Sequence, residues 1–176
     1  MAQDQSVPDI WLLSDARNDR KLEAAIMRLP PGSGFVFRHY HLGPCERAAR
    51  FAQVLPLLRS AGHWAIVSGG FQTAEAWGAD GVYGGSDAIP PPPLRWIATA
   101  HDAAEIADAN TYGASAVMLS PVFPTRSHPG AATLGSARFR ALAAQAEMPV
   151  IALGGMNAER ARALGWPRWA AIDGLS

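Results

Sequence analysis

The residues best suited to chemistry lie in a loop-rich stretch of the second half of the chain. Residues 117–135 read VMLSPVFPTRSHPGAATLG, an apolar strand that runs into a long loop of Pro, Ser, Thr and Gly. Thr125 and Ser127 offer hydroxyl groups. Arg126 and His128 offer N–H donors, and prolines stiffen the loop that presents them. Hydrogen-bond donors of these types suit an anion. Long loops in compact domains are usually functional, so we interpret this one as a binding loop. The alternative is a rigid crossover whose polar residues only face water.

A second stretch suited to anion binding is residues 150–164, VIALGGMNAERARAL. It reads as a buried apolar strand, a glycine pair at Gly154 and Gly155, and a helix capped near Asn157. Amides at a helix N-terminus carry partial positive charge, and paired glycines let an anion approach the backbone. A phosphate group is the natural occupant of such a turn. The alternative is a tight strand-to-helix turn in which the glycines only allow the bend.

A third feature is the strand FVFRHYHL, residues 35–42, which places Arg38 on one face and two histidines, His39 and His41, on the other. An inward Arg38 would be a costly buried charge unless it met a ligand or a carboxylate such as Asp15 or Asp87. The histidines would then face the helices, where packing and hydrogen bonds explain them. A metal site at the His-x-His spacing is the less favoured alternative.

His101 closes the apolar run RWIATAH and precedes Asp102, which suits the N-cap of a following helix. A histidine at a strand end can act as an acid or a base. On its own, this position is also explained by a polar residue whose ring is satisfied by its neighbours.

The elements that must position these residues alternate between short apolar runs and Ala-, Leu- and Arg-rich stretches with helical spacing, which is typical of repeated βα units. The eight predicted strands are residues 9–14, 34–41, 63–68, 80–83, 95–100, 116–120, 149–153 and 169–173. The six predicted helices are residues 19–29, 45–61, 73–77, 103–112, 136–146 and 158–164. The segment GGSDAIPPPPL after the fourth strand cannot hold a helix, because consecutive prolines lack amide donors. The fourth crossover is therefore predicted to be a loop.

Glycines decide between a closed barrel and an open doubly wound sheet. They follow several predicted strands, where they would form the top face of a barrel: Gly69, Gly70, Gly84, Gly85, Gly154 and Gly155. An open nucleotide-binding sheet would instead carry G-x-G-x-x-G after its first strand, where this chain reads SDARND. We therefore predict one domain over residues 1–176, a compact α/β (β/α)8 barrel with a degenerate fourth crossover, no final helix and no dinucleotide cofactor. Its missing last helix would expose apolar strand surface, so we expect a homodimer or a displaced segment to cover it.

Composition narrows the function classes. The chain has 176 residues, whereas a full barrel of this type usually needs about 250. Lys plus Arg and Asp plus Glu number 15 each, so no long-range field recruits nucleic acid or an anionic membrane. The single Cys45 excludes an internal disulfide and a cysteine-built zinc site. With no signal peptide or long apolar run, we expect a cytoplasmic protein with a small-molecule ligand.

At these motifs the chain resembles the thiamine phosphate synthase and TenI family of barrels. The similarity runs from DIWLLSDAR through WGADGVYGG and WIATAHDAAEIADANTYGASAVML to PVIALGGMNAER, which is nearly the whole chain. SPVFPTRSHPG resembles the family's G-P-V-F-P-T-x-T/S-K loop, and ALGGM resembles its A-I-G-G-I phosphate loop. The resemblance implies one of two reactions. The synthases join a pyrimidine methyl diphosphate to a thiazole phosphate and release diphosphate with the help of Mg²⁺, whereas TenI proteins tautomerise the thiazole phosphate.

The resemblance also implies roles for residues that match the family's motifs. These are Arg38 for the diphosphate arginine, Thr125 and Ser127 for the strand-six hydroxyls, Gly154 and Gly155 for the phosphate loop, and His101 for the proton-transfer histidine.

Several positions depart from the family pattern, mostly on the diphosphate side. This chain has Val36 where the family has Gln, Tyr40 where it has Lys, and Ser68 with Gly69 where it has Asn-Asp. It also has His128 in place of the strand-six Lys, and Asp173 in place of a Ser that helps to hold phosphate. The family's strand-four motif G-Q-x-D reads GGSDA here, so Asp87 is displaced by one position from the family's Asp. Asp87 is the one nearby carboxylate left for Mg²⁺. Asp173 would repel a phosphate, so Arg126 or Arg168 would have to compensate.

We therefore expect a protein of thiamine biosynthesis that binds a thiazole phosphate or thiamine phosphate ligand. We expect either weak synthase activity or a tautomerase-like proton transfer, with His101 as the base. The anion would be held by Arg38, Thr125, Ser127, His128 and the glycine pair. The alternative is a catalytically silent barrel that senses or carries such a ligand or assists an enzyme. An unrelated phosphate-sugar barrel, such as an isomerase, is a third interpretation, because many barrels share the glycine loop.

Overall fold

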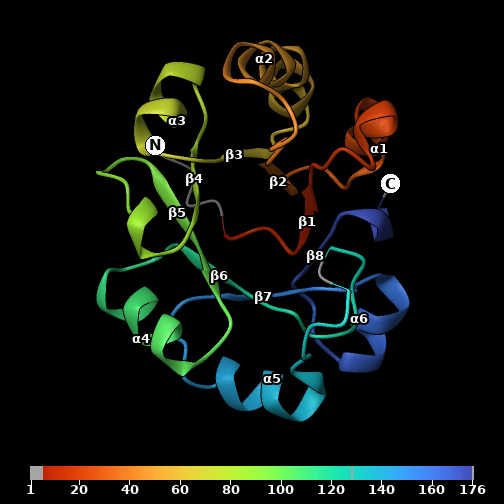
Figure 1. Ribbon diagram of the computed structural model, residues 1–176, viewed down its shortest axis with the longest axis vertical. Coiled ribbons are helices and arrows are strands. Elements are labelled where there is room, and N and C mark those ends of the chain that lie inside the picture. The colour runs from red at the N-terminus through yellow and green to blue at the C-terminus, as the bar shows by residue number, and fades with distance from the viewer. Residues whose placement is uncertain (1–5, 128, 176) are drawn as a thin grey trace.

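Eight parallel strands close into a barrel in the computed structural model, which describes residues 6–127 and 129–175. Each strand pairs with its neighbours in the chain, and β1 pairs with β8 to complete the ring (Figure 1). The strands are β1 Ile10–Leu13, β2 Gly34–Phe37, β3 Trp64–Ser68, β4 Gly81–Gly84, β5 Arg95–Ala100, β6 Ala116–Leu119, β7 Val150–Leu153 and β8 Trp169–Ala171. The predicted barrel is confirmed, and a strand forms in each of the eight predicted ranges. β2 is shorter than predicted and ends at Phe37, not at residue 41, because the backbone turns at His39, which has a φ of 37°.

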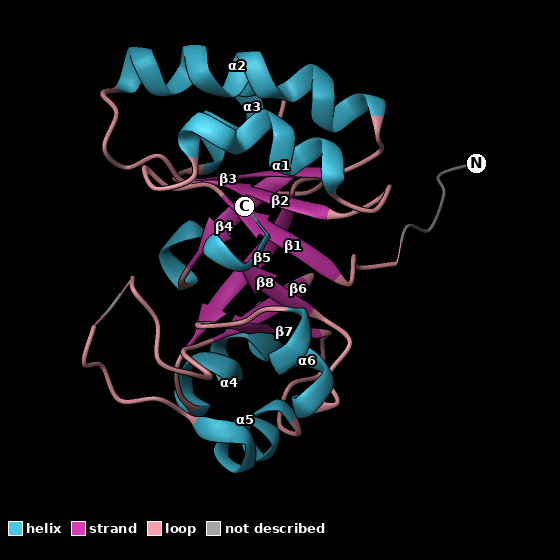
Figure 2. Cartoon of the chain, turned by 90° about the vertical axis from the view of Figure 1, so that its right-hand side faces the viewer, coloured by secondary structure: helices cyan, strands magenta, loops and turns pink. Residues whose placement is uncertain are grey.

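Helices surround the barrel on the outside, as the side view in Figure 2 shows. They are η1 Asp19–Lys21, α1 Leu22–Arg28, α2 Pro44–Ser60, α3 Phe71–Trp77, η2 Ser86–Ala88, α4 Ala103–Thr111, α5 Gly135–Ala143, α6 Ala158–Leu164 and η3 Asp173–Leu175, where η marks a short 3-10 helix. The crossover between β4 and β5 holds only η2, as its prolines predicted. After β8 the described chain forms only η3.

Two apolar layers follow from the alternation of side chains along the strands. The first fills the barrel, where Trp11 of β1 meets Trp64 of β3 edge to face, with ring centroids 6.0 Å apart. The second lies between the barrel and the helices and includes Phe35, Phe37 and Phe139. The predicted strands are thus buried on both faces, which explains their nearly continuous apolar sequences.

The outer face of β8 is covered within the chain itself. Trp169 and Ala171 are only 6% and 4% exposed, and both belong to the outer apolar layer. The exposed strand surface that motivated the expected homodimer is therefore not present, and the oligomeric state stays a prediction. No helix of the described residues is long and apolar enough to cross a membrane.

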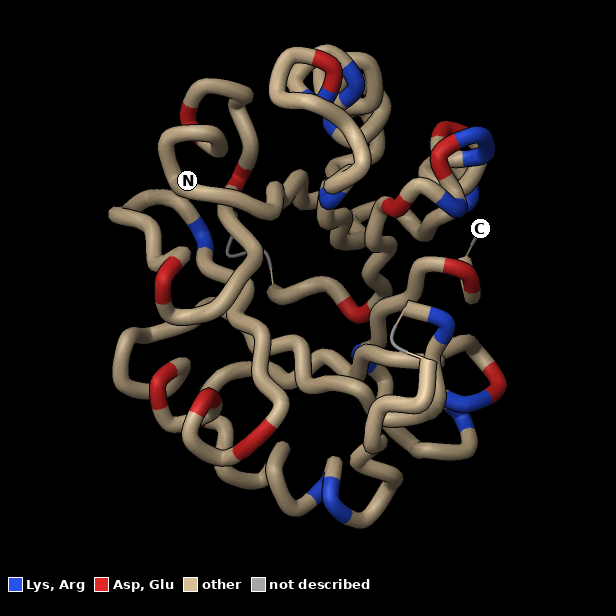
Figure 3. The backbone as a smooth tube through the Cα atoms, in the orientation of Figure 1, with Lys and Arg blue, Asp and Glu red and all other residues tan. Residues whose placement is uncertain are grey.

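Charged residues gather on the helices and on the loops, whereas the barrel wall is nearly free of them (Figure 3). At the amino ends of the strands, Arg168 pairs with Asp9 at 3.2 Å. A charge that faces into the barrel at the carboxyl ends is therefore an exception, and such charges mark the candidate site.

Candidate functional site at the barrel mouth

The carboxyl ends of the strands form an opening that we call the barrel mouth. Side chains that continue the inner-face alternation reach it from five strands or the loops that follow them, namely Asp15, Arg38, Ser68, Tyr83, Thr99 and His101. In a barrel of parallel strands this end is where ligands bind. The polar character of the mouth contrasts with the apolar interior directly below it.

Arg38 faces inward, as predicted. Its Nη2 lies 3.9 Å from Oδ2 of Asp15, so its partner is Asp15 and not Asp87. The backbone amide of Arg38 donates to Oγ of Ser14 at 2.8 Å, and the guanidinium lies 5.2 Å from the ring centroid of Tyr40. The Nε atom is buried and has no hydrogen-bond partner among the described residues. Arg38 therefore keeps one donor that no described residue uses.

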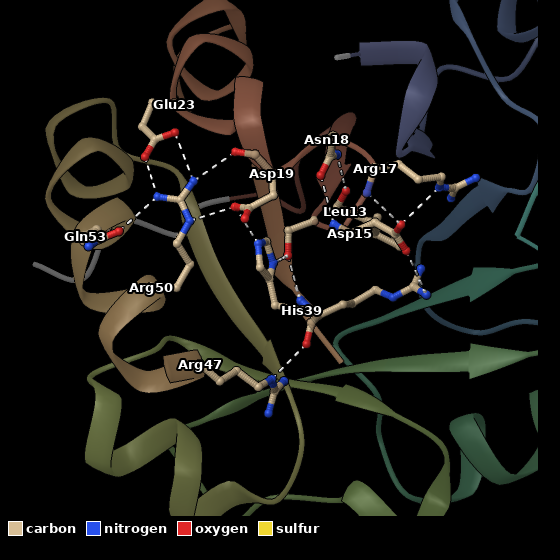
Figure 4. A network of polar contacts seen from close by, with 12 residues as sticks. Leu13, Asp15, Arg17, Asn18, Asp19, Glu23, His39, Arg47, Arg50 and Gln53 are labelled. Atoms are coloured by element: carbon tan, nitrogen blue, oxygen red, sulfur yellow. Dashed lines mark hydrogen bonds and ion pairs between the residues drawn. The ribbon is translucent and has the colours of Figure 1, made fainter. Parts of the chain in front are cut away.

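Asp15 is shared between two arginines. Its Oδ1 accepts hydrogen bonds from Nε of Arg17 at 3.0 Å and from the Arg17 amide at 3.2 Å. Partial burial opposes ionisation of Asp15, but the hydrogen bonds from Arg17 and the charges of Arg17 and Arg38 outweigh it and lower the pKa of the carboxyl. Asp15 is consequently ionised at neutral pH and holds two cations at the mouth, Arg17, which Figure 4 shows beside it, and Arg38.

The loop after β6 meets Arg17, one of these two arginines. Oγ of Ser127 accepts a hydrogen bond from Nη2 of Arg17 at 2.9 Å, and the Ser127 amide donates to Oγ1 of Thr125 at 3.3 Å. Arg126 is exposed. His128, the predicted substitute for the strand-six lysine, lies outside the described residues. The predicted hydroxyl loop is thus brought to the mouth together with a cation that the sequence did not single out.

The glycine pair after β7 is required by the backbone. Gly154 and Gly155 have φ values of 97° and 62°, which favour glycine. A Cβ atom at Gly154 would lie 2.7 Å from Cα of Pro121, and one at Gly155 would lie 2.4 Å from the carbonyl oxygen of Pro124. The tight-turn interpretation of the pair is therefore satisfied, and its role in phosphate binding stays a prediction. Asn157 caps α6 as predicted, accepting the Arg160 amide at 2.8 Å.

His101 stands at the end of β5 and is paired with a carboxylate. Its Nδ1 lies 2.9 Å from Oε2 of Glu105 in α4, and its amide donates to the same oxygen at 2.6 Å. Its side chain is 58% exposed. Because β5 is four strands from β1 in either direction around the ring, His101 lies across the mouth from Asp15 and Arg17.

Asp87 does not join the mouth cluster. It is exposed on η2 and lines a hollow of about 250 Å³ with two other acidic residues, Glu105 and Asp108, beside Gly85, Ser86 and Trp96. Glu105 is already engaged by His101. The residue predicted as a doubtful metal ligand therefore lies beside α4 and not against Arg38.

Where the family pattern has lysine and Asn-Asp, this chain has a pair of hydroxyl groups and another arginine. Oη of Tyr40 lies 2.6 Å from Oγ of Ser68. Arg47 of α2 donates to the carbonyl oxygens of Ser68 and Arg38, at 2.5 and 2.8 Å. On the neighbouring strand, burial raises the pKa of Tyr83 to about 12 against the opposing charge of Arg38, so its phenol stays protonated.

Behind the mouth, a chain of polar contacts holds the end of β2 (Figure 4). His39 stacks on Phe37 on the outer face, as predicted, with ring centroids 4.5 Å apart. Its Nδ1 lies 2.7 Å from Oγ of Ser14, and its Nε2 lies 2.8 Å from Oδ1 of Asp19. The Nε of Arg50 donates to the same Asp19 oxygen at 2.8 Å.

This network bears on the metal alternative. Asp19, His39 and His41 offer ligand atoms within 4.8 Å of one another. Both ring nitrogens of His39 nevertheless have partners, and Arg50 already neutralises Asp19. The geometry is that of a satisfied hydrogen-bond network, which agrees with the packing interpretation that the sequence favoured.

Comparisons with known proteins agree with this architecture. Residues 12–172 match the family model described as thiamine monophosphate synthase. The chain belongs to the thiamine monophosphate synthase family. It is 31% identical over 155 residues to the thiamine-phosphate synthase of Chloroflexus aurantiacus, covering 82% of this chain and 70% of that protein. It is also 36% identical over 102 residues to the thiamine-phosphate synthase of Salinispora arenicola, covering 53% of this chain and 49% of that protein.

A solved structure extends the likeness in fold. The thiamine phosphate pyrophosphorylase from Pyrococcus furiosus superimposes with a TM-score of 0.78 at 22% identity, covering 96% of this chain and 87% of that one. A structure described as native KDPGal aligns less well, with a TM-score of 0.64 at 14% identity. These two structures support the fold alone, and membership of the thiamine monophosphate synthase family rests on the sequence matches.

In this member of the thiamine monophosphate synthase family, the sequence analysis did not identify Arg17 and Glu105 as residues of the site. It expected Arg126 or Arg168 to compensate Asp173, whereas the structure pairs Asp173 with Arg17. Nη1 of Arg17 lies 3.2 Å from Oδ2 of Asp173, whereas Arg168 is paired with Asp9 at the opposite end of the barrel. Glu105 carried a recognisable signal, because it follows His101 by four residues at a helix start.

Proposed function

We propose that the chain binds a phosphate monoester of thiamine biosynthesis, a thiazole phosphate or a thiamine phosphate, at the barrel mouth. The observation that carries the proposal is the pair of guanidinium groups, Arg17 and Arg38, held at one carboxylate beside the hydroxyl of Ser127 in a chain of this family. Guanidinium groups bind phosphate oxygens through two parallel hydrogen bonds. Thr125, His128 and the turn at Gly154 and Gly155 would complete the anion site.

His101 would move a proton in a tautomerase-like step. When Nδ1 donates to Glu105, the other ring nitrogen, Nε2, is the unprotonated atom that can accept a proton from a bound thiazole. The imidazolium then returns the proton to a second atom of the ligand, so the step consumes no proton. Glu105 would fix the orientation of the ring and hold its Nδ1 proton.

The residues present do not fit the Mg²⁺ ion that the family implies for diphosphate chemistry. Mg²⁺ is held by carboxylates together with phosphate oxygens. Asp87 is exposed on η2, and the family's Asn-Asp position carries Ser68, which is engaged by Tyr40. Ionising a diphosphate requires its developing charge to be neutralised. The geometry therefore favours proton transfer over synthase activity, and we derive no step through a metal.

A catalytically silent barrel that carries or senses the same ligand is the second candidate. The observation in its favour is Asp173, a carboxylate at the position where the family pattern has a phosphate-holding serine, already paired with Arg17. The two candidates share the binding site and differ in turnover, so one set of variants tests both.

Calorimetric titration with thiazole phosphate and thiamine phosphate, with and without Mg²⁺, tests the binding site. We expect saturable binding that Arg38→Ala weakens at least about tenfold and Ser127→Ala weakens less, because a charged donor contributes more than a hydroxyl. Arg168→Ala removes a cation at the opposite end of the barrel and is the matched control, expected to bind as the wild type does. No heat with either ligand would overturn the thiamine proposal.

Turnover is tested by following proton exchange into thiazole phosphate in D₂O by NMR. We expect His101→Gln to slow exchange about a hundredfold, which is typical for the loss of a general base, without a comparable loss of binding. Tight binding with no exchange in the wild type would reject the tautomerase step and support the silent barrel.

A further inference from the structure

Arg17 joins three loops from distant parts of the chain. From the loop after β1, its Nε reaches Asp15 at 3.0 Å, its Nη1 reaches Asp173 after β8 at 3.2 Å, and its Nη2 donates to Ser127 after β6 at 2.9 Å. Its side chain is 25% exposed. All three nitrogens of a planar, permanently charged group are therefore directed to oxygen atoms at the mouth, and two of those oxygens belong to carboxylates.

The contact with Asp173 lies against the glycine turn after β7. A Cβ atom at Gly174, the next residue, would stand 2.4 Å from the carbonyl oxygen of Met156. A Cβ atom at Gly155 would stand equally close, at 2.4 Å, to the carbonyl oxygen of Pro124 in the β6 loop. The loops after β6, β7 and β8 thus abut, and Arg17 contacts the first and the last of them directly.

The charges around Arg17 balance without a ligand. Two guanidinium groups, Arg17 and Arg38, face two carboxylates, Asp15 and Asp173. A phosphate group brought to Arg17 would meet repulsion from Asp173, because like charges at short range oppose each other. Asp173 is 44% exposed, so its side chain can turn to water, whereas Asp15 is 24% exposed and also holds Arg38. Asp173 is the carboxylate that can leave.

We propose that Arg17 is a phosphate-binding residue of the mouth and that Asp173 occupies its guanidinium until a phosphate monoester displaces the carboxylate. The exchange replaces one carboxylate with a group that carries more negative charge and three acceptor oxygens. The Nη2 contact with Ser127 would remain and orient the guanidinium. The inference rests on the proposed function for the identity of the ligand, but not for the chemistry of the phosphate group itself.

The test compares Asp173→Asn, Arg17→Ala and the double variant by calorimetric titration, with inorganic phosphate and thiazole phosphate as separate probes. Asn keeps the shape of Asp and removes the charge, so we expect both probes to bind about tenfold more tightly to Asp173→Asn. We expect Arg17→Ala to weaken binding about tenfold or more, because a charged donor is lost. The double variant should bind as Arg17→Ala does, since Asp173 acts through Arg17.

Control variants distinguish this exchange from a purely structural role of the Arg17–Asp173 ion pair in holding the loops together. Asp9→Asn removes the same charge at the other end of the barrel, where Asp9 pairs with Arg168, and should leave both affinities unchanged. Arg17→Lys keeps the charge without the fork and should bind with intermediate affinity. Circular dichroism and thermal unfolding of each variant show whether it is folded. If Asp173→Asn binds phosphate no more tightly than the wild type, or Arg17→Ala binds it equally well, the inference is wrong.

The two probes keep the failure of this inference apart from failure of the proposed function. Thiazole phosphate binding that depends on Arg38 but not on Arg17 or Asp173 overturns the exchange and leaves the proposed function standing. A different result would reject the thiamine ligand alone. In that case the variants would change the affinity for inorganic phosphate as expected, but Asp173→Asn would not raise the affinity for thiazole phosphate. The exchange at Arg17 would then be supported, and thiazole phosphate would be rejected as the ligand.

Discussion

At the scale of single residues, His39 shows how the backbone below the mouth is held. It has a φ of 37°, a conformation unusual for a residue other than glycine, and it is fully buried. Its ring stacks on Phe37 and bridges Ser14 and Asp19. Ser14 in turn accepts the amide of Arg38, so the strain at His39 is offset by contacts that position Arg38, the arginine proposed to bind the anion.

We expect His39→Ala to lower the free energy of unfolding by roughly 2–3 kcal/mol, because two buried hydrogen bonds and the stacking are lost while the unusual backbone remains. His39→Asn should lose less, since Asn tolerates positive φ and keeps a polar side chain. Chemical denaturation of both variants beside the wild type measures the difference. An Ala variant as stable as the wild type would show that the network contributes nothing to folding.

At the scale of elements, the packing of β1 on β2 depends on a missing side chain. Trp11 of β1 pairs with Gly34 of β2, and a Cβ atom added at Gly34 would lie 2.1 Å from the Trp11 indole. Gly34→Ala should therefore destabilise the protein by about 1–3 kcal/mol through overpacking of the barrel interior. Thermal and chemical unfolding test this, with Gly62→Ala as a comparison at a site with open space but positive φ. Adding Trp11→Phe should recover part of the loss, and no recovery would place the strain elsewhere.

The elements themselves were largely predictable, because strands buried on both faces read as apolar runs and the helices between them keep their spacing. The differences lie at the ends of elements. β2 ends at Phe37 and not at residue 41, and α5 ends at Ala143 and not at residue 146. α2 begins at Pro44 and α3 at Phe71, earlier than predicted, since Gly43 and Gly70 are extended N-cap residues and Pro44 suits the first helical position. These signals were present in the sequence, but glycine before a helix is also typical of an ordinary loop.

At the scale of the whole molecule, the contacts that build the mouth were the part that sequence reasoning could not reach. Motifs predicted Arg38, Ser127 and the glycine turn one by one. The mouth is connected through Arg17, whose hydrogen-bond partner Ser127 lies 110 positions away, and no local pattern encodes that distance. The compensation of Asp173 was assigned to Arg126 or Arg168, whereas closure of the barrel brings β1 and β8 together and Arg17 with them to Asp173.

The closed barrel also buries histidines, and this predicts how stability depends on pH. Burial lowers the pKa of His39, although Asp19 opposes the shift, and burial likewise lowers the pKa of His63. Nδ1 of His63 accepts the Ser33 amide at 3.0 Å, which a protonated nitrogen cannot do. The unfolded chain therefore binds more protons than the folded one once the pH falls below the ordinary histidine value of 6.5.

The free energy of unfolding should thus be highest above pH 6.5 and fall as the pH drops from 7.5 to 5.5. Asp15, Asp19 and Glu23 stay ionised across this range, because their lowered pKa values place their own loss of stabilisation at more acidic pH. His63→Asn supplies an acceptor that does not titrate, so its stability should change less with pH than that of the wild type. Urea denaturation at the two pH values measures both slopes. Equal slopes would mean that His63 is protonated as readily in the folded chain as in the unfolded one, and His63 would then contribute nothing to the acid sensitivity of the barrel.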